Sequence, residues 1–409
     1  MNERLHHGPS RCLWGSLLVL VGMILGCGDT GDAPPSSDAP PVEVRGVWLT
    51  NVDSDVLDSR TSIEEAMRFL AQHNFNVVFP VVWHGGTTLY PSAVMDSLFG
   101  VPIKPRHAGR DPLAEVVAAA HQYGLAVIPW FEFGFSAQHT DPTATRILQQ
   151  RPEWAARDAD GNVLTKNGFR WMNAYHPEVQ NLLAALVREV ATTYNVDGIQ
   201  GDDRLPAQPV EGGYSAFTVE RYRETHNAPP PDDPRDAGWM RWRADQLSAF
   251  AGRIYREVKA IDSTLTVSWA PSVYPWSYNE YLQDWPTWIR NGHADWVHPQ
   301  VYRRDTTRYR QTLRTQLPDS LNVPASVRKR LYPGILLKVG DDRVSADAML
   351  HAVRTNRALG LSGEVFFFYE GLRENNDALA DTLRQTVYRT PAQVPHLEPR
   401  YLEPRSPEP

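Results

Sequence analysis

The stretch VDGIQGDD, residues 196–203, decides the fold class. It is a short apolar run with two adjacent carboxylates, Asp202 and Asp203, at its C-terminal end. A continuous apolar run of this length is typical of a strand buried on both faces of a parallel sheet. The polar end marks the point where such a strand leaves the core, which is where parallel α/β proteins place their functional groups.

Other stretches of the same character alternate with segments of helical periodicity along the chain. The predicted strands are residues 44–50, 76–83, 125–132, 196–202, 265–271, 295–302, 331–337 and 364–370. The predicted helices are residues 62–73, 112–123, 177–194, 239–261, 281–291, 309–317 and 345–359. Parallel strands joined by crossover helices in this number close into a barrel, so we predict an α/β fold, a single (β/α)8 TIM barrel with extended βα loops. A doubly wound open sheet is the alternative, which we disfavour because no Gly-rich phosphate turn follows the first strand.

Both ends of the chain differ in composition from the part between them. We predict a lipoprotein signal peptide at residues 1–27, a flexible tether at 28–41, the barrel domain at 42–390 and a disordered tail at 391–409. The apolar run in the first segment ends at Cys27, which we expect to carry the lipid; an uncleaved signal anchor is the alternative. In either case we expect an exported protein, attached to a membrane of the cell envelope.

Charge and motifs exclude several classes of function. The formal charge of −7 is spread along the chain without basic blocks, so we expect no nucleic-acid partner. The sequence contains no nucleotide fingerprint, nucleophile elbow or phosphate loop, so we expect no cofactor. Because Cys12 and Cys27 are the only cysteines, the predicted barrel has no disulfide. We expect a monomer.

Three carboxylates at predicted strand ends are the catalytic candidates: Asp202, Glu132 and Glu370. Side chains alternate along a strand, so Gln200 and Asp202 share the face toward the barrel axis. Glycoside hydrolysis needs one carboxyl group to protonate the leaving oxygen and a second to act as nucleophile or to activate water. The alternative for each acid is a structural salt bridge at the barrel rim, with Arg45 or Arg204 as partner.

Aromatic and polar residues near the same strand ends are the candidates for substrate binding. Aromatic rings stack on the apolar faces of sugars, and amides, hydroxyls and imidazoles bind their hydroxyl groups. The candidates are Trp83, Tyr90, Trp130, Gln200, Asp203, Trp269, His298, Gln300 and Tyr302. Tyr90 belongs to a long loop, residues 84–92, that we expect to cover the substrate. Core packing is the alternative for about half of the tryptophans.

Several short motifs occur in the order found in a known family. They are RGVWLT at residues 45–50, LYPS at 89–92, WFE at 130–132, HPEV at 176–179, DGIQ at 197–200 with Asp202 and Asp203, and PQVY at 299–302. Together they resemble the glycosyl-hydrolase-like 10 family over roughly residues 42–383. The resemblance implies an exported, often lipid-anchored (β/α)8 barrel related to glycosidases, with some members acting on peptide-free peptidoglycan glycan strands. This chain departs from the family pattern at Gly201, where we expect a more open cleft floor.

The function predicted from these observations is hydrolysis of a poly- or oligosaccharide by carboxylate acid/base catalysis. A non-catalytic carbohydrate-binding barrel is one alternative, which would keep the aromatic cleft without turnover. A metal-dependent hydrolase is a weaker one, because no His-x-His follows the first strand and His298 stands nearly alone with Gln300, so we expect no metal.

Overall fold

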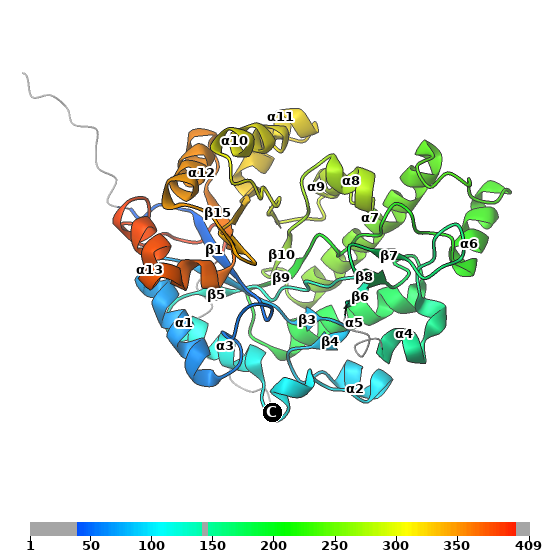
Figure 1. Cartoon of the computed structure of the whole chain (residues 1–409), viewed down its shortest axis with the longest axis horizontal. Coiled ribbons are helices and arrows are strands. Elements are labelled where there is room, and N and C mark those ends of the chain that lie inside the picture. The colour runs from blue at the N-terminus through cyan, green and yellow to red at the C-terminus, as the bar shows by residue number, and fades with distance from the viewer. Residues whose placement is uncertain (1–38, 141–145, 398–409) are drawn as a thin grey trace, which may run out of the picture. The chain divides into compact units, whose positions relative to one another are not determined.

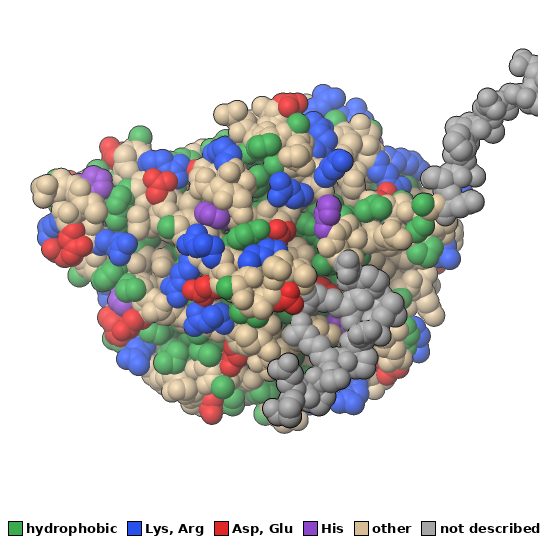
Figure 2. All heavy atoms as spheres, turned by 180° about the vertical axis from the view of Figure 1, so that it is seen from behind, with side chains coloured by type: hydrophobic (Ala, Val, Ile, Leu, Met, Phe, Trp, Pro, Cys, Tyr) green, Lys and Arg blue, Asp and Glu red, His purple; other side chains and the backbone are tan. Residues whose placement is uncertain are grey.

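A computed structural model describes residues 39–140 and 146–397. The predicted signal peptide, Cys27 and most of the predicted tether lie outside the described residues. Among the helices of the described part, none has the length and apolarity that a membrane crossing requires. Figure 2 shows Lys and Arg side chains intermixed with Asp and Glu over one face of the folded part.

Eight short strands form two parallel sheets, and each lies within one of the predicted strands except β15, which begins one residue before its predicted range. The order of the five-stranded sheet is β12 (Gly334–Leu336), β15 (Gly363–Phe367), β1 (Val44–Leu49), β2 (Val77–Pro80) and β5 (Ala126–Val127). The order of the three-stranded sheet is β11 (Trp296–Val297), β10 (Thr266–Trp269) and β9 (Gly198–Gly201). Every pair in these two sheets is parallel. The prediction of parallel strands in an α/β fold is confirmed.

Single bridges connect the two sheets at both of their edges. Beyond β5, Trp130 pairs with Gln200 of β9. At the other edge, Val297 of β11 pairs with Leu331, and Gln300 pairs with Gly334 of β12. The C-terminal ends of strands from both sheets therefore meet at one place, which is where the predicted site residues follow.

Most crossover helices follow the predicted ones closely, whereas α13 and most of α8 were not predicted. They are α1 (Arg60–Gln72), α3 (Pro112–Gln122), α5 (Pro177–Thr193), α7 (Ala237–Ile261), α8 (Trp276–Tyr281), α9 (Trp285–Arg290), α10 (Thr306–Thr315), α12 (Ala346–Ala358) and α13 (Tyr369–Gln385). Figure 1 shows α1, α12 and α13 on the outer side of β1 and β15. The helix predicted over residues 281–291 is two helices, because Leu282 adopts a left-handed conformation (φ 56°) and Pro286 starts a new helix.

Insertions between the crossover units were not predicted. An antiparallel sheet of β6 (Ser136–His139), β8 (Phe169–Trp171) and β7 (Thr165–Lys166) separates β5 from α5, and a hairpin of β3 (Trp83–His84) and β4 (Thr87–Thr88) follows β2. The remaining described elements are the helices α2 (Ala93–Phe99), α4 (Arg146–Gln150), α6 (Ala216–His226) and α11 (Pro318–Leu321), the short 3₁₀ turns Pro105–His107, Pro152–Trp154 and Ala325–Arg330, and the strands β13 (Lys338–Val339) and β14 (Asp342–Arg343). Their strands are too short and too polar to give a periodic signal.

Part of the segment predicted as a disordered tail is folded onto the first strand. The Gln393 amide donates to the Pro41 carbonyl at 2.8 Å, and the Gln393 carbonyl accepts from the Glu43 amide at 3.0 Å. The Asn76 side chain also donates to the Ala392 carbonyl at 3.1 Å. Ordered chain therefore extends beyond the predicted boundary at residue 390.

Candidate active site

Asp202 follows β9 directly and is almost completely buried, with 2% of its surface exposed. Its Oδ1 accepts a hydrogen bond from Gln300 Nε2 at 3.0 Å, and its Oδ2 accepts one from Arg204 at 3.1 Å. Burial raises the pKa of Asp202 well above its ordinary value, and the neighbouring carboxylate of Asp203 raises it further, while Arg204 opposes both. Asp202 is thus a fixed carboxyl group at a strand end, with two donors aimed at it.

Arg204 is the centre of the charged cluster. Its guanidinium lies 3.1 Å from Asp202, 3.0 Å from Asp203 and 3.6 Å from a Glu132 oxygen. Its Nε also donates to the Glu132 backbone carbonyl at 3.1 Å. Burial lowers the pKa of Arg204, but the three carboxylates outweigh this effect and raise it above the ordinary value. The cluster therefore holds three acids around one permanent cation, and the predicted salt bridge of Asp202 to Arg204 is present.

Two aromatic rings cover the Arg204 guanidinium. The Phe133 ring centre lies 5.6 Å from the guanidinium carbon, and the Phe169 ring centre lies 4.8 Å from it. Phe169 comes from β8, so the inserted antiparallel sheet contributes a side chain to the site. Rings at this distance attract a cation and exclude water, so they strengthen its ion pairs.

Glu132 is the least firmly held of the three acids. Its Oε2 is buried and accepts no hydrogen bond among the described residues, and His84 Nε2 lies 3.9 Å from it. Burial raises the pKa of Glu132 to about 7, with Arg204 acting in the opposite direction. A carboxyl group with a pKa of about 7 is protonated in about half of the molecules at pH 7, so it can supply the proton that a general acid donates.

His84 was not predicted as a site residue. Its ring packs on Phe133 with centroids 4.1 Å apart, and its Nδ1 lies 3.3 Å from Lys104 Nζ. Burial lowers the pKa of His84 well below its ordinary value, and the nearby cations, Lys104 first, lower it further. The imidazole is therefore neutral at physiological pH. Its position directly after the second predicted strand was the signal that could have identified it.

The polar candidates on β9 and on the segment that follows β11 divide into two layers. Gln300 and Tyr302 reach the cluster: Gln300 bonds Asp202, and burial followed by the charges of Asp202 and Asp203 raises the pKa of Tyr302 well above its ordinary value. Gln200 and His298 lie fully buried beneath them. Gln200 accepts from Trp48 Nε1 at 2.6 Å and donates to a serine hydroxyl, and burial lowers the pKa of His298 to about 3. These two residues position the strands and do not face the cleft.

The comparisons with known proteins agree with this arrangement. A sequence profile described as glycosyl hydrolase-like 10 matches residues 43–347, three quarters of the chain. The chain belongs to the glycosyl hydrolase-like 10 family. It is 26% identical over 400 residues to the glycosyl hydrolase DigH of Escherichia coli K12, covering 82% of this chain and 85% of DigH. It is 22% identical over 396 residues to the glycosyl hydrolase YngK of Bacillus subtilis, covering 87% of this chain and 74% of YngK.

Solved structures show the same fold at low sequence identity. The glycoside hydrolase domain of PgaB (BpsB) from Bordetella bronchiseptica matches with a TM-score of 0.61 and 14% identity, covering 84% of this chain and 99% of that domain. The catalytic domain of a β-amylase from Paenibacillus polymyxa matches with a TM-score of 0.58 and 11% identity, covering 86% of this chain and 99% of that domain. The glycosyl hydrolase-like 10 fold of this chain is therefore of the TIM-barrel type found in glycoside hydrolases.

The departure from the glycosyl hydrolase-like 10 pattern at Gly201 does not open the cleft floor. A Cβ atom at this position would lie 2.4 Å from two ring carbons of Trp269 and 2.6 Å from the Leu205 carbonyl. The Trp269 indole already fills the space that a side chain at position 201 would need. The expectation of a more open floor is wrong, because the glycine permits Trp269 to pack against the backbone of β9.

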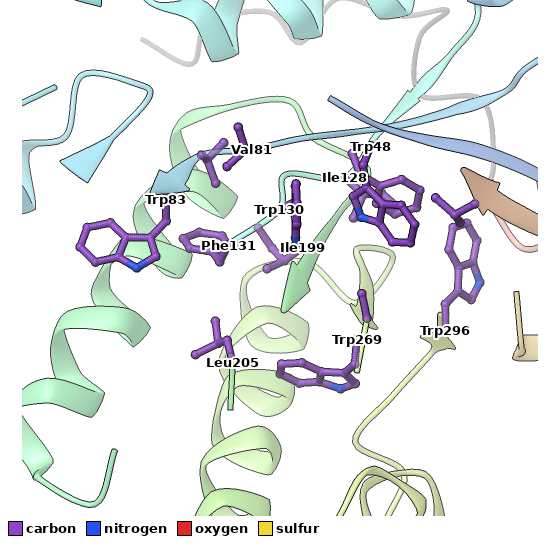
Figure 3. Close-up of a cluster of buried hydrophobic side chains, with 14 of the residues drawn as sticks. Trp48, Val81, Trp83, Ile128, Trp130, Phe131, Ile199, Leu205, Trp269 and Trp296 are labelled. Atoms are coloured by element: carbon purple, nitrogen blue, oxygen red, sulfur yellow. The ribbon is translucent and has the colours of Figure 1, made fainter. Parts of the chain in front are cut away.

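Three aromatic candidates belong to the core and not to the cleft. Trp83 and Trp269 are at most 1% exposed, and their Nε1 groups donate to the carbonyls of Gly134 and His293. In Figure 3, Trp83 lies beside Phe131 and Trp269 beside Leu205 within the apolar cluster. Tyr90 is completely buried and donates to Glu189 of α5 at 3.0 Å. The structure thus places these three side chains in the core, in agreement with the alternative of core packing.

Trp130 is buried among apolar side chains, with its indole N–H also buried. Only 3% of it is exposed, and its ring lies 6.2 Å from Trp48 and 6.4 Å from Phe367. Its buried Nε1 has no hydrogen-bond partner within the described part of the chain. Figure 3 shows the indole near the middle of the apolar cluster, close to Trp48. It therefore packs below the charged cluster.

Glu370 is not part of the cluster around Arg204. The predicted strand over residues 364–370 ends at Phe367, and Glu370 lies in the first turn of α13. Its carboxylate accepts a hydrogen bond from Ser54, and burial raises its pKa to about 7. It lines a separate hollow with Asp55 and Arg373. The alternation that would aim it at the axis fails because the chain is helical there.

Arg45, the other predicted salt-bridge partner, lies at the opposite end of the strands. It pairs with Glu43 at 2.9 Å and donates to the Thr390 carbonyl at 2.6 Å. Among the described residues, no three His, Cys, Asp or Glu side chains are arranged to hold a metal ion.

Proposed function

We propose that this protein is a glycoside hydrolase in which Glu132 is the general acid and Asp202 is the second carboxylate, acting as nucleophile or base. The observation that carries the proposal is the shared ion pair: one Arg204 nitrogen lies 3.1 Å from Asp202 and 3.6 Å from Glu132. Glycosidic bond cleavage requires two carboxyl groups that flank the scissile bond, and the ion pairs to Arg204 hold Asp202 and Glu132 near each other. Family membership and the glycoside hydrolase neighbours support the same class of reaction.

The hydrogen bonds support this division of roles. Gln300 and Arg204 both donate to Asp202, and donors of this kind stabilise the ionised form. Glu132 Oε2 has no donor among the described residues, and its pKa is about 7. Burial raises the pKa of both Asp202 and Glu132, so these two acids retain a proton at neutral pH. We assign it to Glu132, because two donors bond to Asp202 whereas Glu132 Oε2 has none among the described residues.

We propose that the two parallel sheets form one (β/α)8 barrel. The bridges from Trp130 to Gln200 and from Val297 to Leu331 support closure, since they connect the free edges of both sheets. The short strands and single bridges are consistent with the strong tilt that barrel strands adopt.

The substrate we propose is a poly- or oligosaccharide, with peptide-free peptidoglycan glycan strands as the first candidate. The family resemblance of the sequence motifs favours this glycan. We also propose that the protein is exported and anchored through a lipid on Cys27, a proposal that rests on the apolar run before this cysteine. Detergent partitioning and mass spectrometry of the N-terminal peptide, with Cys27→Ser as control, test the anchor.

The test of the reaction is release of reducing ends from a panel of glycans by the folded part, residues 40–397. Wild type should cut at least one glycan, and Asp202→Asn and Glu132→Gln should each lower kcat at least 100-fold while circular dichroism and melting temperature show a folded protein. Glu370→Gln is the matched control, because it is also a glutamate of raised pKa but lies outside the cluster, in the first turn of α13.

Two outcomes would overturn the proposal. Full activity of both cluster variants would remove the catalytic role of these acids. Tight binding of a glycan without turnover by wild type would make the protein a carbohydrate-binding barrel, in which Arg204 neutralises the acids permanently.

A further inference from the structure

Gln283 is a fully buried glutamine that bonds to the backbone of Asp202. It lies between α8 and α9, directly after the left-handed Leu282. Its Nε2 donates to the Asp202 carbonyl at 2.9 Å and to the Pro206 carbonyl at 3.3 Å. One side chain from another loop therefore holds both ends of the turn that contains Arg204.

The turn of residues 202–206 is attached to its neighbours at two points. The Phe135 amide donates to the Arg204 carbonyl at 3.0 Å, and Gln283 donates to the Asp202 carbonyl. The Leu205 amide also donates to the Asp202 carbonyl, at 3.1 Å, but this bond lies within the turn. It closes the turn without fixing its position relative to the rest of the barrel. Gln283 supplies that fixed point for Asp202.

The backbone of Gln283 is itself held firmly. Its amide donates to the Ser277 carbonyl at 3.1 Å, and the Ser277 hydroxyl donates to the Gln283 carbonyl at 3.0 Å. The next residue, Asp284, forms an ion pair of 2.6 Å with Arg241 of α7. Gln283 is therefore an anchored donor, and the position of α7 and α8 constrains the backbone of Asp202.

The loop that follows the turn is attached to α8 independently of the Gln283 side chain. The Gln208 amide donates to the Tyr281 carbonyl at 3.1 Å, and the Val210 amide donates to the Glu280 carbonyl at 2.9 Å. These backbone bonds remain when the side chain at position 283 is changed. We therefore expect loss of the Gln283 amide to release the turn of Asp202 and to leave the rest of the loop in place.

The other atom of the Gln283 amide does not add to stability. Its Oε1 is buried and accepts no hydrogen bond from the described residues. A buried acceptor without a donor costs free energy, whereas the Asp202 carbonyl would keep its bond from Leu205 if Gln283 were apolar. A glutamine at this position is thus better explained by the placement of Asp202 than by stability.

We infer that Gln283 is a positioning residue for Asp202. It fixes the main chain from which the carboxyl group extends, while Gln300 and Arg204 fix the carboxyl group itself. The inference rests on the proposed function and names a residue outside the charged cluster on which the rate depends. A displacement of about 1 Å at a reacting group can cost about 100-fold in rate. Because Gln283 is fully buried, it acts on kcat and not on substrate binding.

The first test compares Gln283→Met with wild type on a glycan that wild type cuts. Methionine has a similar length and no donor, so the Asp202 carbonyl keeps only the bond from Leu205. We expect kcat to fall about 10- to 100-fold and KM to stay within about twofold. The urea midpoint should change little, because the unpartnered Oε1 is lost together with the donor. A lower midpoint with unchanged kcat would make Gln283 a purely structural residue and overturn the inference.

Gln283→Glu tests whether the donated hydrogen bond is what matters. A protonated carboxyl group can donate to the Asp202 carbonyl, whereas an ionised one cannot. At mildly acidic pH, the ratio of kcat to that of wild type should therefore be higher for Gln283→Glu than for Gln283→Met. Equal ratios for the two variants at this pH would overturn the inference.

Gln316→Met is the matched control. Gln316 is also a buried glutamine that bonds to the backbone of another loop, since it accepts from the Tyr274 amide at 2.8 Å and donates to the Tyr274 carbonyl at 2.9 Å. We expect this variant to unfold at a lower urea concentration and to keep the kcat of wild type. A similar loss of kcat in Gln316→Met and Gln283→Met would show a general sensitivity to buried glutamines and overturn the inference.

Failure of the inference and failure of the proposed reaction give different results. If wild type cuts a glycan and Gln283→Met cuts it equally fast, the hydrolase stands and the inference falls. If wild type cuts no glycan, crystal structures of wild type and Gln283→Met decide. An Asp202 carboxyl group that leaves Gln300 and Arg204 in the variant supports the positioning role alone, and unchanged bonds of Asp202 overturn it.

Discussion

At the scale of single residues, Arg204 determines what the site can do. Burial and the neighbouring carboxylates raise the pKa of Asp202 and of Glu132, and the Arg204 guanidinium opposes both shifts. With one cation among three acids, the cluster keeps a proton that it can donate. The same cation orients two of the carboxyl groups through bonds of 3.0–3.1 Å to Asp203 and Asp202.

The pH dependence of activity should report the proton on Glu132. Its pKa is raised from 4.5 to about 7, so the acid form is lost as the pH rises through about 7. We expect kcat/KM to fall about tenfold per pH unit above that value, as measured by initial rates on a soluble oligosaccharide. A pH profile that is flat from pH 6 to 9 would contradict the assignment of Glu132 as the acid.

The raised pKa of Glu132 also affects the free energy of unfolding. A buried carboxyl whose pKa is raised on folding stabilises the folded state at low pH, and this contribution is lost between its unfolded pKa of 4.5 and about 7. Urea unfolding of wild type should show that the unfolding free energy decreases over this pH range. The same measurement on Glu132→Gln should show a smaller decrease. Glu370→Gln tests the same effect at a site outside the cluster.

At the scale of elements, two loops are locked together by their backbones. Gly134, with φ +47°, brings its loop so close to the Arg204 carbonyl that a Cβ would lie 2.1 Å from it. The Phe135 amide donates to the same carbonyl at 3.0 Å. The loop after β5 thus fixes the backbone from which the Arg204 side chain extends, and it also supplies Glu132.

Strand β9 depends on a second glycine. Gly201→Ala should lower the unfolding free energy by about 1–3 kcal/mol, because the added methyl overlaps the Trp269 ring. Chemical denaturation measures the effect. Gly238→Ala, in the first turn of α7, is the control and should leave stability unchanged or slightly higher. Equal stability of both variants would show that Trp269 moves freely away from β9.

At the scale of the whole molecule, periodicity predicted the strands and their order well, because buried parallel strands have few alternative sequences. It also predicted that Asp202 and Glu132 meet, since strand ends converge in this architecture. It placed Glu370 on a strand, although a helix starts one residue earlier. It also did not show that Trp83 and Trp269 lie in the core. Whether an indole is buried depends on neighbours such as Gly201, which lie far from it in the sequence. Local sequence patterns do not identify such neighbours.

The contact of the C-terminal segment with β1 was missed because its prolines and charges resemble those of a linker. A chain that ends at Thr390 loses the pairing of Gln393 with Pro41 and Glu43. We expect it to be less stable than a chain that ends at Leu397 by about 1–3 kcal/mol, measured by urea unfolding. Identical midpoints would show that this pairing is too weak to matter.

The backbone link between Gly134 and Arg204 has a consequence for engineering substrate range. Libraries that vary residues 130–136 or 201–206 would disturb the charged cluster together with its supports, and most members would lose activity. The turn at Gly85 and Gly86 and the segment near Val101 line a cavity together with His84 and Phe133, and the ion pairs of Arg204 with the three acids do not involve them. Substitutions at these positions should change the substrate specificity while the charged cluster around Arg204 stays unchanged.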